Sequence, residues 1–349
     1  MFKKSYEPYP NKSYPIKQIP SIEPNAYQQE QINRGFGMFL HFGINTFNNV
    51  EWSNGKLDIN SYNPTSINAE QWIKTAYEAG MNYVILITKH HDGFCLWDTD
   101  TTKYSIKYSP CKIDVVKEVA NACKKYDIKL GLYYSLWDRN NKNYKSKKKF
   151  NLYLDYMETQ LKELLGGYYG EIIELWLDGS WDKSCRSWGL DRLYNYVKIM
   201  QPKCQIGVNL TIGKFTERAC IPNSRYKPLN YRNYDPIRMF PSDFRLWDPL
   251  MCRKDDPKIY TFNGEKYYLP FEQTICSRKK QSWFYSDKYE DKDLINSENI
   301  ITNYKILKES NNLLVINLPP NKNGELVQGD IDNLLKVADA LNIRRKLSS

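Results

Sequence analysis

The feature that most constrains this chain is the alternation of short apolar runs with amphipathic helical segments. The apolar runs are rich in β-branched residues and lack a polar-apolar alternation, which is typical of buried parallel strands. Predicted strands at 36–43, 83–89, 129–135, 172–177 and 205–210 alternate with predicted helices at 68–79, from 114 onward, at 148–165 and at 190–200. Four strand–helix units in series predict a parallel sheet with right-handed crossovers.

The second half of the chain carries a weaker pattern. Short strands are predicted near 239–242 and at 271–276, followed by a helix at 293–309, a strand at 313–317 and a helix at 330–341. Eight strands favour a (β/α)8 barrel of the α/β class with an irregular second half, and a six-stranded open sheet is the competing architecture. We expect residues 1–30, rich in Pro, Tyr and Asn, to be an extended lead-in and residues 31–345 to form the barrel.

Composition limits the classes of function. The chain of 349 residues has a net charge of +10, but dispersed lysines supply it and no nucleic-acid-binding motif accompanies it, so we expect no nucleic-acid partner. The eight cysteines form no Cys-x-x-Cys pair, which argues against a zinc site and gives no disulfide framework. No signal peptide or membrane span is recognisable, so the expected compartment is the cytoplasm, or the exterior if a leader peptide has been removed.

The chain contains three histidines, and all of them fall at the ends of predicted strands. His41 follows the first apolar run, and His90 and His91 follow the second within Lys89-His90-His91-Asp92-Gly93-Phe94. Adjacent residues on a strand face opposite sides, so the His90–His91 pair is not expected to chelate one metal, and one of the two could be structural. Neutral imidazoles at a strand end suit hydrogen bonds to substrate hydroxyls.

Polar and aromatic residues gather where the predicted strands end, which is where a barrel places its functional side chains. The candidates are His41, His90, His91, Tyr134, Trp176, Asp178, Arg238, Asp243 and Glu272. Asp178 is the most informative of them, because a carboxylate directly after a buried strand is costly unless it has partners or a function. A helix N-cap or a loop ion pair is the alternative. No phosphate loop, nucleophile elbow or His-x-His pair is present.

Several motifs together resemble those of the α-L-fucosidases of glycoside hydrolase family 29. They occur in the order of the family and span about 36 to 320. The matching segments are Phe39-Leu40-His41-Phe42-Gly43, Glu51-Trp52, Lys89-His90-His91-Asp92-Gly93-Phe94, Leu132-Tyr133-Tyr134-Ser135, Leu175-Trp176-Leu177-Asp178-Gly179, Ser282-Trp283-Phe284-Tyr285 and the stretch from Asn311 to Pro320. The Lys-His-His-Asp-Gly-Phe block is the most specific of them.

The resemblance implies a retaining exo-glycosidase that works through a covalent glycosyl-enzyme and uses no metal or organic cofactor. By position, Asp178 matches the nucleophile of the family. The residues that match fucose contacts or the pocket wall are His41, Glu51, Trp52, His90, His91, Tyr134, Trp176 and Trp283. The implied partner is a fucosylated oligosaccharide or glycoconjugate, with no membrane partner; a homo-oligomer remains open.

The acid/base residue is where the resemblance leaves two candidates. Asp243 aligns with an acid/base glutamate in one branch of the family, and Arg238 then matches a substrate-contacting arginine. Glu272 resembles the glutamate assigned in other members. Retention requires the two carboxyl groups to lie roughly 5 Å apart.

The chain departs from the family in two respects, and three rival functions are compatible with its sequence. Many members carry a β-sandwich after the barrel, and we expect none within this chain, which extends about thirty residues past Pro320. The segment 211–270 is divergent, which leaves the linkage preference open. The rival functions are a hydrolase of a related sugar such as an α-L-galactoside, a carbohydrate-binding barrel with an inactive site, and a metal-dependent hydrolase.

Overall fold

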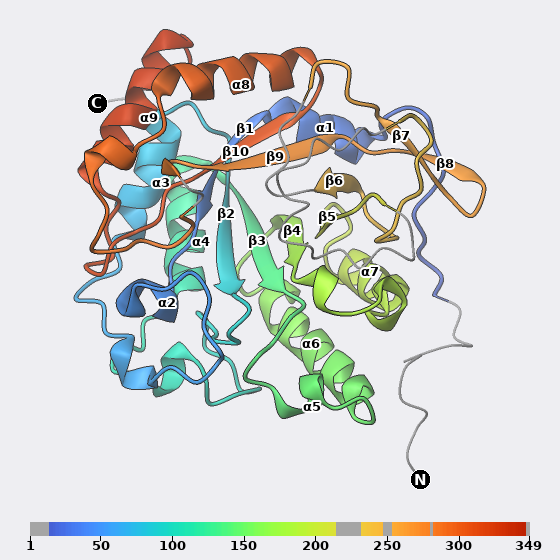
Figure 1. The fold of residues 1–349 in the computed structure, drawn as a ribbon, viewed down its shortest axis with the longest axis horizontal. Helices are drawn as coiled ribbons and strands as arrows, with labels where there is room; N and C mark the ends of the chain where they lie inside the picture. The colour runs from blue at the N-terminus through green and yellow to red at the C-terminus, as the bar shows by residue number, and fades with distance from the viewer. Residues whose placement is uncertain (1–13, 214–231, 247–252, 280–281, 347–349) are drawn as a thin grey trace.

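The computed structural model describes residues 14–213, 232–246, 253–279 and 282–346. Within these ranges eight parallel strands close into a barrel, in the order β1-β10-β9-β6-β5-β4-β3-β2 (Figure 1). The barrel strands are β1 (Phe36–Leu40), β2 (Tyr83–Lys89), β3 (Lys129–Ser135), β4 (Ile172–Asp178), β5 (Gln205–Asn209), β6 (Phe244–Leu246), β9 (Phe271–Cys276) and β10 (Leu313–Asn317). The predicted (β/α)8 barrel is confirmed, and the open sheet is excluded by the pairing of β1 with β10.

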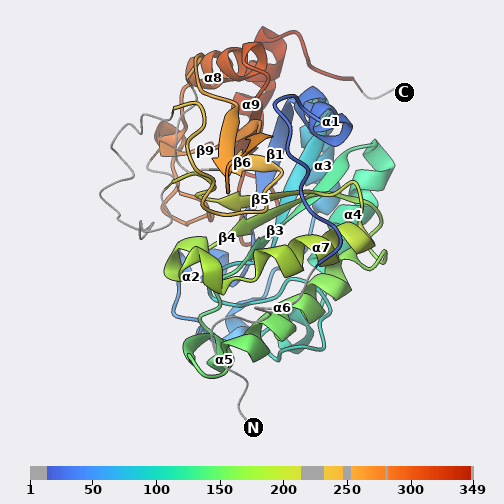
Figure 2. The same ribbon diagram turned by 90° about the vertical axis from the view of Figure 1, so that its right-hand side faces the viewer.

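Helices surround the barrel, as the two views in Figures 1 and 2 show. Their bounds are α1 (Ala26–Arg34), α2 (Ile44–Asn48), α3 (Ala69–Glu78), α4 (Val115–Tyr126), α5 (Lys142–Lys145), α6 (Phe150–Leu165), α7 (Leu190–Met200), α8 (Ser297–Glu309) and α9 (Gln328–Ala340). Helix starts follow from capping residues: Asn68 accepts a hydrogen bond from the Gln71 N–H, and Asp114 from the Lys117 N–H. The predicted helix ranges agree with the observed ones to within four residues.

Two sequence predictions differ from the structure. The sixth barrel strand lies at Phe244–Leu246 and not near 239–242. Pro241 lacks the N–H that a central strand needs, and the Arg238 and Met239 N–H groups both turn to the Thr211 carbonyl. The lead-in, described from residue 14, ends at helix α1, which begins at Ala26 behind a capping box formed by Asn25 and Gln28.

A small antiparallel hairpin, β7 (Ile259–Phe262) and β8 (Glu265–Tyr268), lies outside the barrel between β6 and β9. Tyr260 and Tyr267 of the hairpin and the following Leu269 form a second buried cluster with Ile212 and Ile237. The hairpin therefore packs against Ile212, which follows β5, and against Ile237, while the main core fills the barrel and its contacts with the helices.

Three further features concern the described part of the chain alone. None of its helices combines the length and apolarity needed to cross a bilayer. It contains no cluster of three or more His, Cys, Asp or Glu side chains arranged to hold a metal ion. The six cysteines within it form no disulfide bond with one another.

Candidate active site

Asp178 is the last residue of β4, and its carboxylate is held by two neighbouring strands. Its Oδ2 accepts a hydrogen bond from the Tyr133 hydroxyl at 2.8 Å, and its Oδ1 accepts one from the Asn209 side-chain amide at 2.9 Å. His91 Nε2 lies 3.5 Å from Oδ2. Only 8% of the residue surface is exposed. These contacts fix the carboxylate at the carboxyl end of the barrel, so the predicted position of Asp178 is confirmed.

Gly179 lets the chain turn away directly after Asp178. Its φ of +72° lies in the left-handed region, and a Cβ there would come within 2.7 Å of the Trp137 Cβ. Only glycine meets both demands without strain. The turn leaves the Asp178 carboxylate at the barrel mouth, because the following residues leave the strand at once.

His91 is oriented by Ser135 at the end of β3. The His91 Nδ1 lies 2.7 Å from the Ser135 hydroxyl oxygen, and that hydroxyl donates its own proton to the Trp137 carbonyl. Ser135 can therefore only accept from the ring, which places a proton on Nδ1. The Nε2 edge then faces Asp178, and it carries a proton as well when the ring is cationic.

His41 is oriented in the same way by Asn317 at the end of β10. The Asn317 amide nitrogen donates to the Trp283 carbonyl, so its oxygen, 2.8 Å from His41 Nδ1, is the acceptor and Nδ1 carries the proton. Burial lowers the pKa of His41 to about 3, so the ring is neutral. Its Nε2 is left as a hydrogen-bond acceptor.

His90 completes a cluster of three imidazoles. Its ring centre lies 4.2 Å from that of His91 and 6.1 Å from that of His41, and the ring stacks on Tyr133. Burial, together with the neighbouring His91 and His41, holds the pKa of His90 well below its usual value. Both adjacent histidines reach one site because the pairing register shifts between Ile87 and Lys89, at the end of β2.

Aromatic side chains and one acid surround this cluster. The Glu51 carboxylate accepts the backbone N–H groups of Trp283 at 3.0 Å and Phe284 at 3.4 Å, and burial raises its pKa to about 7. The Trp283 ring lies 5.1 Å from that of His41, and the Trp52 ring, 39% exposed, lies 5.2 Å from that of His91. The structure thus brings Glu51, Trp52 and Trp283 to the predicted site.

Trp176 lies one pleat deeper inside the barrel, on the same strand face as Asp178. Its ring stacks on Tyr133 at 5.6 Å and also contacts Phe39. The indole Nε1 is buried and has no hydrogen-bond partner among the described residues. Trp176 therefore lies at the base of the site, as predicted.

Tyr134 does not belong to the site, although the sequence placed it there. Its hydroxyl donates to Gln160 of α6 at 2.6 Å and accepts from the Lys89 ammonium at 2.9 Å, on the outside of the barrel. Successive residues of a strand point to opposite faces, and it is Tyr133 that points inward to Asp178. The prediction for Tyr134 is wrong by one residue.

Exchange of each tyrosine for phenylalanine separates the two positions. We expect Tyr133→Phe to lower kcat by about 10- to 100-fold, because a hydrogen bond to a charged group contributes about 1.5–3 kcal/mol. Tyr134→Phe is the matched control; it should lower thermal stability and leave kcat of the folded enzyme within about twofold. Steady-state kinetics with an aryl glycoside, paired with thermal unfolding, measure both effects. Equal losses of kcat in the two variants would contradict the assignment.

Asp243 lies at the opposite end of the barrel from Asp178. It precedes β6, and its Oδ2 accepts the N–H of Ile206, near the start of β5, and contacts the Lys198 ammonium at 2.8 Å. Its Oδ1 accepts the Tyr194 hydroxyl of α7. The prediction of Asp243 as acid/base is wrong, because these contacts hold it on the outside at the amino ends of the strands.

Glu272 is also at the amino end, inside the barrel. It is the second residue of β9, and its Oε2 accepts the hydroxyl of Tyr83, the first residue of β2. Its neighbour is Glu174, the third residue of β4, which pairs with Arg34 of α1. The prediction of Glu272 as acid/base is therefore wrong as well, since Asp178 lies at the other end of β4.

Arg238, a sequence candidate for a substrate contact, lies near the carboxyl end of β5. Its guanidinium donates to the Leu210 carbonyl at 3.0 Å, and the side chain is buried. Leu210 follows Asn209, which contacts Asp178. Arg238 is therefore close to the rim that carries the site.

Four functional neighbours were missed by the sequence analysis. They are Tyr133, Ser135, Asn209 and Asn317, each of which contacts Asp178 or a site histidine. Ser135, Asn209 and Asn317 are the final residues of buried strands, and this position could have identified them as site residues from the sequence. Tyr133 could be identified only from the pairing register of β3 with β4, which sets it opposite Trp176.

The chain was compared with protein families, curated proteins and solved structures. Residues 56–346 match the family described as Alpha-L-fucosidase. Alpha-L-fucosidase 1 of Arabidopsis thaliana is 32% identical over 94% of this chain and 61% of its own length, and a putative alpha-L-fucosidase 1 of Oryza sativa is 30% identical over 92% and 58%. The chain thus spans about 60% of the length of these relatives.

Solved structures agree with the sequence matches. A glycoside hydrolase 29 family member from an unknown rumen bacterium superimposes with a TM-score of 0.76 at 25% identity, over 93% of this chain and 58% of that one. A putative alpha-L-fucosidase from Bacteroides ovatus gives a TM-score of 0.72 at 29% identity, over 95% and 60%.

Proposed function

This chain belongs to the α-L-fucosidase family, glycoside hydrolase family 29, and from that premise we propose that it releases terminal α-L-fucose from glycans or glycoconjugates with retention of configuration. The observation that carries the proposal is the Asp178 carboxylate, held by Tyr133 and Asn209 at the barrel mouth beside three imidazoles. A carboxylate fixed beside hydroxyl-binding groups suits attack on a sugar.

In the proposed reaction the Asp178 carboxylate attacks the anomeric carbon of the bound fucose. The bond to the leaving oxygen breaks as an acid side chain protonates that oxygen, and a glycosyl ester to Asp178 forms. Water, deprotonated by the same side chain, then attacks the anomeric carbon and frees the carboxylate. The hydrogen bonds from Tyr133 and Asn209 hold the carboxylate in position for attack.

The neutral imidazoles and Glu51 are proposed to bind the sugar hydroxyls. His41 offers an acceptor at Nε2, since Asn317 fixes the proton on Nδ1. Glu51, with a pKa of about 7, is present in both protonation states near neutrality and can accept or donate. Trp52 and Trp283 offer apolar ring surface to the C–H groups of the sugar, and Arg238 lies at the same rim.

The proton donor is proposed to be a carboxyl other than Asp243 and Glu272. Retention needs its oxygen atoms within about 5–5.5 Å of those of Asp178, and both sequence candidates lie at the amino ends of the strands. Near the mouth, the described residues include Glu51, whose carboxyl pKa burial raises to about 7.

The function is tested with a panel of aryl glycosides and proton NMR of the first sugar released. We expect hydrolysis of the α-L-fucoside above all others and initial appearance of α-L-fucose. Preference for the α-L-galactoside would favour the rival sugar, and initial β-anomer would contradict retention. Absence of turnover across the panel, with fucose still bound, would favour the carbohydrate-binding alternative. Loss of activity on chelation would favour a metal-dependent hydrolase.

A further inference from the structure

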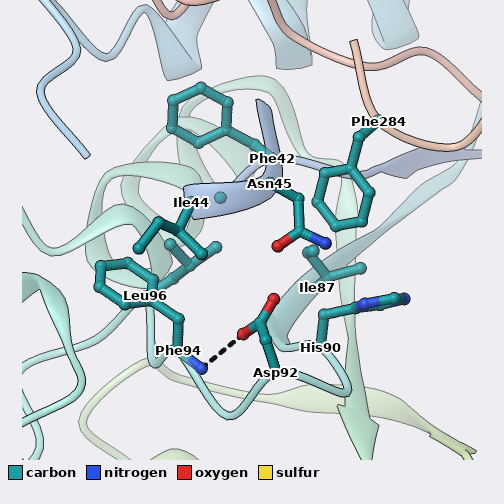
Figure 3. Close-up of a pocket in the computed structure, with 10 residues that line it drawn as sticks. Phe42, Ile44, Asn45, Ile87, His90, Asp92, Phe94, Leu96 and Phe284 are labelled. Carbon is teal, nitrogen blue, oxygen red and sulfur yellow. Dashed lines mark hydrogen bonds between the residues drawn. The ribbon is translucent and has the colours of Figure 1, made fainter. Parts of the chain in front are cut away.

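A cavity of about 10 Å³ lies between β2 and α2, with His90 among its lining residues (Figure 3). Most of its walls are apolar, from Phe42, Ile87, Phe94, Leu96 and Phe284, and its polar groups come from Asn45, His90 and Asp92. A space of this size holds about one water molecule, provided that the water finds two to four polar partners.

Two hydrogen-bond acceptors point toward one another across this cavity. Asn45 donates its amide N–H to the Glu51 carbonyl at 2.9 Å, which fixes the orientation of the amide and turns its oxygen toward Asp92 (Figure 3). That oxygen is buried, and no described residue donates a hydrogen bond to it. One oxygen of Asp92 accepts the Phe94 N–H at 2.7 Å, and the other is left toward Asn45. Two facing acceptors require a donor between them.

His90 lines the same cavity. Its Nδ1 is buried and has no hydrogen-bond partner among the described residues, unlike the Nδ1 atoms of His41 and His91. Burial keeps the ring neutral, so a single proton resides on either Nδ1 or Nε2. If the proton is on Nδ1, Nε2 can accept a hydrogen bond from a ligand. If the proton is on Nε2, Nε2 can donate one.

We propose that one ordered water molecule occupies this cavity, donates to Asn45 Oδ1 and the Asp92 carboxylate, and accepts from His90 Nδ1–H. Asn45 and Asp92 then act as positioning residues, since they hold His90 in the Nδ1–H tautomer without touching the substrate. His90 Nε2 becomes an acceptor for a sugar hydroxyl; this last step rests on the proposed glycosidase function. The water makes three hydrogen bonds, which is the usual number for a buried water.

The tautomer is coupled to the ionisation of Asp92. Burial raises the pKa of Asp92 to about 7, an effect that Asp138 reinforces and that Lys89 and Arg139 oppose. Above this pH the Asp92 carboxylate accepts a hydrogen bond from the water, so the His90 Nδ1–H must donate a hydrogen bond to the water. Below it the protonated Asp92 donates to the water, which then donates to Asn45 and to His90 Nδ1, so the proton of His90 moves to Nε2.

Nitrogen NMR of the three histidines tests the inference. In protein labelled with ¹⁵N-histidine, long-range nitrogen–proton correlations at pH 8.5 distinguish Nδ1–H from Nε2–H for each ring. We expect His90 in the Nδ1–H form. In Asp92→Asn the amide oxygen keeps the Phe94 N–H, so the NH₂ group faces the cavity, donates to the water and shifts His90 to Nε2–H. His41 is the internal control, because Asn317 should hold it in the Nδ1–H form in both proteins.

Three results would overturn the inference. They are an Nε2–H tautomer of His90 in the unmodified protein at pH 8.5, an unchanged tautomer in Asp92→Asn, and a shift of His41 together with His90. If Asp92→Asn does not fold, titration of the unmodified protein from pH 8.5 to pH 5.5 should produce the same change of tautomer. The spectra are recorded without substrate, so their outcome is independent of whether fucose is the sugar released.

Discussion

Replacement of Asp178 by alanine is expected to lower kcat by at least about 10⁴-fold, because a nucleophile that forms the covalent intermediate has no substitute in the site. The fold should survive, since the side chain lies at the barrel mouth and not in the core. The variant loses the hydrogen bonds that the Tyr133 hydroxyl and the Asn209 amide donate to Asp178, at a cost of about 1–3 kcal/mol each in the free energy of unfolding. Steady-state kinetics and chemical unfolding measure the two effects.

Azide distinguishes a lost nucleophile from a distorted site. In the space vacated by the Asp178 side chain, azide can attack an activated aryl α-L-fucoside directly, and the product should be β-L-fucosyl azide. A variant that lacks the proton donor instead passes through the glycosyl-enzyme and gives the α-azide. Substantial turnover of Asp178→Ala without azide, or an α-azide product, would contradict the assignment of Asp178.

Asp243→Asn is the matched control for this experiment. Asp243 is equally buried and equally hydrogen-bonded, but it lies at the amino ends of the strands, between β5 and α7. The variant should lose stability, because the Lys198 ammonium at 2.8 Å loses its counter-charge, while kcat of the folded fraction should remain within about twofold. Azide should not change the product in this variant.

The strands and helices were predictable because local signals decide them. The buried runs that form β2, β3 and β4 are continuous and apolar, and Asn68 and Asp114 mark helix starts by capping. β6 was not placed correctly, because its three residues are too few to show any periodicity. Helix α1 was missed because its nine residues are mostly polar, and the Asn25–Gln28 capping box is the one sequence signal that marks its start.

The acid/base candidates failed for reasons that strand boundaries explain. A strand near 239–242 would have put Asp243 at a carboxyl end, whereas a strand that begins at Phe244 puts it at an amino end. The strand containing Glu272 was placed correctly, and its own bounds already assigned Glu272 to the amino end. Tyr133 and Tyr134 differ only in face, and the face depends on the register with β4, which a single sequence does not contain.

Glu272 forms a buried carboxyl pair with Glu174. The two side chains lie side by side inside the amino end of the barrel. The Tyr83 hydroxyl donates to Glu272 Oε2, and Gln31 and Arg34 donate to Glu174 Oε2. The Oε1 atom of each carboxyl is buried and accepts no hydrogen bond from the other described residues. Burial raises the pKa values of both, and the proximity of Glu174 raises that of Glu272 further. One proton shared by the two carboxyls resolves the contact.

This shared proton makes the stability of the barrel depend on pH. The folded protein keeps the proton well above pH 4.5, the ordinary pKa of a glutamate, whereas the unfolded chain releases it near that pH. Stability from the pair is therefore fully present below about pH 4.5 and is lost as the pH rises toward the folded pKa. One proton corresponds to a slope of about 1.4 kcal/mol per pH unit in the free energy of unfolding.

Glu272→Gln should remove this slope while leaving activity intact. The glutamine oxygen can accept the Tyr83 hydroxyl, and its NH₂ group can donate permanently to Glu174 in place of the shared proton. Urea unfolding at pH 6, 7 and 8 should show a free energy of unfolding that falls less steeply than in the unmodified protein, by up to about 1.4 kcal/mol per pH unit. An unchanged slope would show that the pair holds no proton.

Glu174→Gln is the control that separates the proton from the ion pair. It can also remove the shared proton, but it removes the carboxylate that lies 3.4 Å from the buried Arg34 guanidinium, so Arg34 loses its direct ion-pair partner. We therefore expect Glu174→Gln to be less stable than the unmodified protein at every pH, with Glu272→Gln the more stable of the two. The pair lies at the opposite end of β4 from Asp178, so kcat of the folded fraction should be unchanged in both variants. A selective loss of kcat in Glu272→Gln would instead support a catalytic role for Glu272.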